Sequence, residues 1–238
     1  MKEKVSINGD EICFSIQKKS IKNINLKVDF DKNINISIPN DMSIAEAKKF
    51  VIDKYGWIQK QIDYFSNYSN VKEKIYFDNG ETVYLQGKQF KMRLIEDDVN
   101  SIILNKKYFE IHSNNVNNKK TLKRIYGNWM KQYSENQLQN VVEQYHKKLK
   151  KYEISLPKIE LRQMKNRWGS CLPDCNKIIF NKSLIKVPDC CIEYVVLHEM
   201  THLKYKYHNK AFYNFLTVQM PDWKERKKIL DEEYIGVV

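Results

Sequence analysis

The chain has 238 residues, of which 42% are hydrophobic and 29% charged, and its formal net charge is +12. This length allows one large domain or two small ones with a substantial buried core. No apolar run approaches the roughly 18 residues of a membrane-spanning helix, and no signal-peptide-like region follows Met1. We therefore expect a cytoplasmic protein without a membrane partner.

The basic composition can attract nucleic acid, anionic substrates or membrane headgroups. The lysines are spread along the whole chain, however, and the sequence contains no arginine-rich run and no zinc-finger spacing. We expect at most weak nucleic-acid binding through the basic surface.

The sequence contains five cysteines, an odd number that favours reduced thiols over a disulfide framework. Cys171, Cys175, Cys190 and Cys191 could form a second, structural zinc site. Because an adjacent cysteine pair suits a single tetrahedral ion poorly, we interpret these residues as small buried hydrophobes.

The first half of the sequence predicts mainly β-structure. Apolar and polar residues alternate over 24–28 and 34–38, which indicates a hairpin with one buried face. A helix should follow, because Ser43 and Glu46 form a capping box and apolar residues recur at helical spacing up to Ile62. Further short strands are expected at 75–77, 82–85, 90–95, 102–104 and 108–111.

The second half predicts mainly helices. From Lys119 to Leu149 the apolar period is 3.6, which indicates one long helix or two. The other expected elements are strands near 157–161 and 177–180 and helices that begin at Pro188, Asn209 and Trp223. The polar stretch Ser113–Asn118 is the expected linker, so we predict an α+β protein with a β-rich region 1–117 and a helical domain 118–238 that contains a small sheet. We see no internal sequence repeat.

The most informative stretch runs from Tyr194 to His202 and contains His-Glu-x-x-His within an apolar, helix-compatible run. Residues four apart lie on one face of a helix, with β-carbons about 5–6 Å apart. His198 and His202 can therefore direct two imidazoles at one metal ion, while Glu199 can reach a water on that ion without being a ligand.

Two further observations favour a metal site over a buried helix with two ordinary histidines. The apolar residues before the motif place Glu199 near a core, where a carboxylate is costly unless it is paired or functional. A third histidine, His208, follows His202 after five intervening residues and completes the three-ligand set of catalytic zinc. A downstream carboxylate, Asp222 or Glu225, is the alternative third ligand.

Several strings together carry a family resemblance. They are 166–171 (Asn-Arg-Trp-Gly-Ser-Cys), 180–185, 194–203 with His208 and Phe212, and, in the first half, 24–38, Trp57-Ile58 and 80–87. This combination resembles the YgjP-like metallopeptidases, a zincin-type family related to the WLM and SprT-like groups.

The resemblance implies a helical minimal zincin core after the β-rich region, a Zn²⁺ ion held by His198, His202 and His208, and Glu199 as the general base. Members of the family are metallopeptidases by their fold, and a nucleoside triphosphate (UTP) pyrophosphatase activity has also been assigned to them. Tyr205 stands where metzincins carry a glycine between the second and third ligands, so metzincin membership is not expected.

The residues that we expect to bind substrate are Arg167, Trp168, Gly169, Ser170 and Tyr207. An extended substrate could add to this segment as a strand, and Gly169 would permit a close approach of backbone to ligand. The developing oxyanion needs a positive partner besides the metal, for which Arg167, Lys165 and Tyr207 are candidates.

The substrate stays open between a peptide or protein and a nucleotide. Three neutral imidazoles favour zinc over magnesium, which prefers oxygen ligands. Basic residues near the motif fit a phosphoanhydride substrate; they are Lys165, Arg167, Lys182, Lys204 and Lys206. The sequence lacks a glycine-rich phosphate loop and an obvious carboxylate cluster for magnesium, which favours the metallopeptidase. A nucleic-acid-associated protein is the third alternative.

Overall fold

The computed structural model describes residues 2–7, 9–28, 32–67, 75–165 and 167–234, and the chain has the expected α+β architecture. It forms two compact units, residues 1–72 and 73–238. The boundary expected from the sequence, between 117 and 118, differs from this division. Ser113 is the fully buried last residue of a strand, and Asn118 caps the following helix, so the polar stretch joins two elements of one unit.

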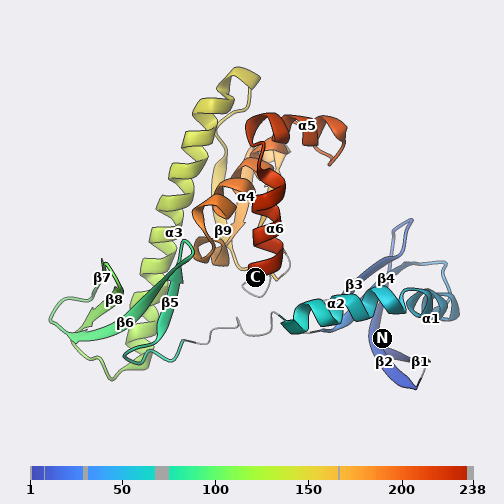
Figure 1. Ribbon diagram of the computed structural model, residues 1–238, viewed down its shortest axis with the longest axis horizontal. Helices are drawn as coiled ribbons and strands as arrows, with labels where there is room; N and C mark the ends of the chain where they lie inside the picture. The colour runs from blue at the N-terminus through green and yellow to red at the C-terminus, as the bar shows by residue number, and fades with distance from the viewer. Residues whose placement is uncertain (1, 8, 29–31, 68–74, 166, 235–238) are drawn as a thin grey trace. The chain divides into compact units, whose positions relative to one another are not determined.

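In its described residues, the first unit contains a four-stranded sheet and two helices (Figure 1). Its elements are β1 (Lys2–Ile7), β2 (Asp10–Lys19), β3 (Asn25–Val28), β4 (Ile34–Pro39), α1 (Ile44–Asp53) and α2 (Tyr55–Asn67). The strand order is β1-β2-β4-β3. The expected hairpin is the antiparallel pair β3–β4, although part of its turn, 29–31, lies outside the described residues. The β1–β2 hairpin was not anticipated.

The helix expected after the hairpin begins as predicted but is not continuous. Ser43 accepts a hydrogen bond from the Glu46 backbone, and Glu46 accepts one from the backbone of Ser43, so the capping box is confirmed. The α1 helix ends at Asp53 with Lys54 as its C-cap, and α2 then starts at Tyr55.

The second unit begins with another four-stranded sheet. Its strands are β5 (Thr82–Leu85), β6 (Lys88–Glu96), β7 (Ser101–Asn105) and β8 (Tyr108–Ser113), in the order β5-β6-β8-β7. This order and its pairings, two antiparallel hairpins joined by a parallel pair, repeat those of the first sheet. The prediction of a strand at 75–77 is wrong. Phe77 has a φ of 61°, and the Tyr76 N–H donates to Glu81 instead of a strand partner.

Among its described residues, the rest of the second unit contains a long helix, a small sheet, three shorter α-helices and three short 3-10 helices, labelled η. Its elements are α3 (Lys119–Leu149), η2 (Lys150–Tyr152), β9 (Lys158–Arg162), β10 (Gly169–Leu172), η3 (Pro173–Cys175), β11 (Lys177–Asn181), η4 (Lys182–Lys186), α4 (Asp189–Thr201), α5 (Lys210–Gln219) and α6 (Trp223–Glu233). The strand order is β10-β11-β9, so β10 is an edge strand. In Figure 1, α3 lies alongside both the β5–β8 sheet and the layer that holds β9 and α4.

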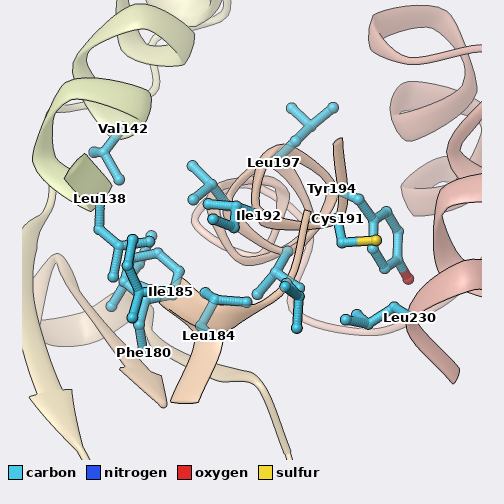
Figure 2. Close-up of a cluster of buried hydrophobic side chains, with 14 of the residues drawn as sticks. Leu138, Val142, Phe180, Leu184, Ile185, Cys191, Ile192, Tyr194, Leu197 and Leu230 are labelled. Carbon is cyan, nitrogen blue, oxygen red and sulfur yellow. The ribbon is translucent and has the colours of Figure 1, made fainter. Parts of the chain in front are cut away.

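The α4 helix lies at the centre of the main hydrophobic core. Figure 2 shows Leu138 and Val142 of α3 on one side of it, and Leu230 of α6 on the other side near Tyr194 and Cys191. All five side chains are buried. Because α4 is packed from both sides, the side chains near its C-terminal end are held on a rigid support. None of the described helices combines the length and the apolar character that crossing a membrane requires.

Candidate metal centre

The α4 helix supplies two of the expected metal ligands. Pro188 precedes its first turn, where a missing N–H costs nothing, and Asp189 interacts favourably with the helix dipole. His198 lies in the last turn, and His202 is the C-cap. The chain then turns back, so that His208 comes just before α5.

The three histidine rings converge at their Nε2 atoms. The His208 Nε2 lies 3.0 Å from the Nε2 of His198 and 3.0 Å from that of His202. Three nitrogen ligands at about 2.0–2.1 Å from a tetrahedral zinc ion lie about 3.3 Å apart, so the donor set has the right size and chemistry for such an ion. Among the described residues, these three histidines form the one group that could hold a metal ion.

The surroundings of two of these rings keep them neutral. Burial is the main reason that the pKa of His198 is lowered to about 3, and the neighbouring His202 and His208 contribute to the same shift. Burial also lowers the pKa of His202. The His202 Nδ1 lies 3.0 Å from the carbonyl oxygen of Tyr205, so the Nδ1–H donates to that carbonyl and the Nε2 carries the free lone pair. The rings therefore present the form that binds metal.

Glu199 lies beside the triad with only 7% of its surface exposed. Burial raises the pKa of its carboxyl group to about 7, while a hydrogen bond from the Cys171 backbone and the charge of Arg167 act in the opposite direction. A carboxyl group with such a pKa can both accept and return a proton near neutral pH.

A cavity of about 610 Å³ surrounds these residues. It is lined by Arg167, Trp168, Gly169, Ser170, Cys171, Pro173, Tyr194, Val195, His198, Glu199, His202, Lys206, Tyr207, His208, Lys227, Leu230 and Asp231. The structure thus brings Glu199, the three histidines and the five expected substrate-binding residues to one cavity. Of the other suggested residues, Lys165, Lys182 and Lys204 do not line it.

Sequence reasoning missed the contribution of α6 to this cavity. Lys227 and Asp231 form an ion pair one helical turn apart, and both line the cavity with Leu230. Their spacing alone is that of an ordinary solvent-exposed helical pair, so the sequence carried no signal that α6 packs against α4.

Among the described residues, neither Asp222 nor Glu225, the alternative third ligands, belongs to the group that could hold a metal ion. Asp222 accepts a hydrogen bond from Arg226 at 2.8 Å. The five cysteines are free thiols, and none belongs to a metal-binding group among the described residues.

Comparison with protein-family models identifies the family of the chain. The YgjP-like, metallopeptidase domain family matches residues 22–233. The chain belongs to this family. YgjP-like metallopeptidases are metal-dependent hydrolases, and the histidine triad of this member could bind the metal ion that the family implies.

Among solved structures, the chain is similar to the crystal structure of the metallopeptidase zymogen of Pyrococcus abyssi abylysin. The two share 19% identity over 39% of this chain and 91% of the other, with a TM-score of 0.36. No curated protein matches the chain.

Proposed function

We propose that this YgjP-like protein is a zinc-dependent metallopeptidase in which His198, His202 and His208 hold the ion and Glu199 is the general base. One observation carries the proposal: three imidazole nitrogens converge beside a buried carboxyl group in a single cavity. Imidazole ligands suit zinc, whereas magnesium and calcium prefer oxygen ligands.

The bound ion would supply a water of lowered pKa and would polarise the scissile carbonyl group. Glu199 accepts a proton from the attacking water and returns it to the leaving amine. Arg167 and Tyr207 line the same cavity and are the proposed partners of the developing oxyanion.

The peptide would lie along β10. This strand is at the edge of its sheet, and Gly169 and Ser170 line the cavity beside Glu199. An extended peptide that pairs with an edge strand gains main-chain hydrogen bonds that are independent of its sequence. We therefore propose unfolded or extended protein segments as the substrate class.

A second candidate function is phosphoanhydride hydrolysis of a nucleoside triphosphate. Arg167, Lys206 and Lys227 line the cavity, and three cationic side chains around the catalytic centre would attract a polyphosphate. Asp231 pairs with Lys227 and reduces this attraction, so the peptidase remains the preferred function.

One experiment separates these functions. Wild type and Glu199→Gln are screened in parallel, with zinc or magnesium, against unfolded proteins, peptides and nucleoside triphosphates. We expect peptide-bond cleavage by wild type, and a zinc-loaded but inactive Glu199→Gln variant. Glu225→Gln removes the same charge from an exposed position outside the cavity and serves as the matched control. Full activity of Glu199→Gln would exclude the base role.

A further inference from the structure

Gly169 of β10 lies directly against the side chain of Glu199. A β-carbon at position 169 would be 2.7 Å from the Glu199 Cγ and 2.8 Å from its Oε1, closer than β-carbons approach other atoms in proteins. Gly169 does not have a positive φ, and it pairs with Phe180 as an ordinary strand residue. Space, and not backbone conformation, is therefore the reason for glycine at this position.

The strand cannot easily move away to make room for a side chain. Asn181 is fully buried and holds the segment before Gly169 with three hydrogen bonds. Its backbone N–H donates to the Trp168 carbonyl at 2.8 Å, and its side-chain amide donates to the carbonyls of Arg167 at 3.0 Å and Met164 at 2.7 Å. Movement of β10 away from α4 would break these bonds. A side chain added at position 169 would therefore displace the group on its other side.

That group is the carboxylate of Glu199. It is held between α4 and β10, where it accepts a hydrogen bond from the Cys171 backbone N–H and lies over the α-carbon of Gly169. Two residues of one strand thus define the carboxylate position, one by a hydrogen bond and the other by leaving space.

We propose that Gly169 is a positioning residue for Glu199: the missing side chain reserves the volume that the carboxylate needs to face the histidine triad. This inference rests on the proposed role of Glu199 as the base. It assigns to the Trp-Gly-Ser segment a task in addition to substrate binding, namely to fix the base from the strand side.

The first test compares Gly169→Ala with wild type as full-length, zinc-loaded protein. We expect kcat to fall about 10- to 100-fold on the substrate that wild type cleaves, because an error of about 1 Å in the position of a catalytic group has an effect of this size. Zinc content and KM should stay near wild type, since the histidines and the free edge of β10, along which the peptide would pair, are unchanged. Gly127→Ala is the matched control, because a β-carbon there meets nothing within 4 Å.

The second test is a stability cycle that needs no substrate. Gly169→Ala should lower the urea midpoint of wild type by about 0.5–1 M. The same substitution in a Glu199→Ala background should lower it by less than half as much, because the clashing side chain is gone.

Equal midpoint shifts in the two backgrounds would overturn the inference, as would a kcat of Gly169→Ala at the wild-type level. The proposed function fails on a different result, namely full activity of Glu199→Gln, so the two failures are distinguishable.

Discussion

Phe212 packs against His202, with 4.6 Å between the ring centroids. The same phenylalanine ring lies 5.1 Å from His198 and 4.8 Å from His208, so one side chain contacts all three proposed ligands. Phe212 is fully buried in the first turn of α5, whose N-cap Asn209 accepts a hydrogen bond from the Phe212 backbone N–H. The Phe212 ring is therefore an apolar support against which all three histidine rings pack.

Replacement of Phe212 should affect both the stability of the protein and its metal binding. We expect Phe212→Ala to lower the free energy of unfolding by about 3–5 kcal/mol, and to weaken zinc binding because the three rings lose a common contact. Chemical unfolding and chelator competition measure the two effects. Val218→Ala, on the exposed face of the same helix, should stay within about 0.5 kcal/mol of wild type. Wild-type zinc affinity in Phe212→Ala would contradict the supporting role.

His208→Ala tests the third ligand. With two imidazoles left, zinc affinity should fall by more than about 100-fold, beyond the 10- to 100-fold typical of changes outside the ligand set. Metal analysis after dialysis against a chelator gives the result. His146→Ala, on α3 and outside the triad, is the control. An unchanged zinc affinity in His208→Ala would show that another residue is the third ligand.

Zinc should also stabilise the folded protein. An ion that binds only the folded state raises the free energy of unfolding by about 4 kcal/mol when its free concentration is 1,000 times the dissociation constant. Removal of zinc with a chelator should therefore lower the melting temperature, and zinc should restore it. In a His198→Ala/His202→Ala variant, the melting temperature should not respond to either treatment. A response of the same size in this variant would place the stabilising ion elsewhere.

Local patterns predicted most of the elements and the site. The capping box at Ser43, the strand 82–85 and the helix 223–233 have the expected positions, because each depends on neighbouring residues. The spacing of His198 and His202 fixes their common face for the same reason. In each case the residues that decide the structure are within one or two turns of one another.

Long-range relationships could not be predicted from such patterns. The parallel pairs β2–β4 and β6–β8 join strands that are not consecutive, and alternation in a strand does not identify its partner. The common order of the two four-stranded sheets was therefore not visible. The division at residue 72 was missed too, because α3 packs on β7 and β8 and joins the second sheet to the helical region.

Arg226 connects α6, which contributes to the cavity, to α4. It donates hydrogen bonds to Asp222, to Glu193 and to the carbonyl oxygen of Cys190. Hydrogen bonds to charged groups contribute about 1.5–3 kcal/mol each, so Arg226→Met should lower the free energy of unfolding by about 2–3 kcal/mol.

Urea unfolding measures this effect. Lys228→Met is the matched control, because Lys228 is highly exposed and its pair with Glu232 is 4.0 Å long. Exposed pairs of this kind contribute about 0–1 kcal/mol. Equal costs for the two substitutions would show that Arg226 does not hold α6 to α4.

The turn between β5 and β6 supports the start of α4. The backbone N–H groups of Gln86 and Gly87 donate to the carbonyls of Ile185 at 2.7 Å and Lys186 at 3.0 Å, and the Gln86 side chain donates to Asp189 at 2.6 Å. The first sheet of the second unit thereby fixes the end of α4 that is opposite the histidines. The same contact gives a structural reason for Gly87, the last residue of the 80–87 string.

Gly87 and Gly80 allow this contact to be measured. Both have positive φ values, 74° and 88°, so alanine is strained at either position by about 1–2 kcal/mol. A β-carbon at 87 would also lie 2.8 Å from the Cγ of Pro188, whereas one at 80 would meet nothing within 4 Å. We expect the free energy of unfolding of Gly87→Ala to be about 1–3 kcal/mol lower than that of Gly80→Ala, as measured by urea unfolding. Because the backbone strain is common to both variants, the difference reports the packing of the turn on Pro188, and equal stabilities would show that the turn does not support α4.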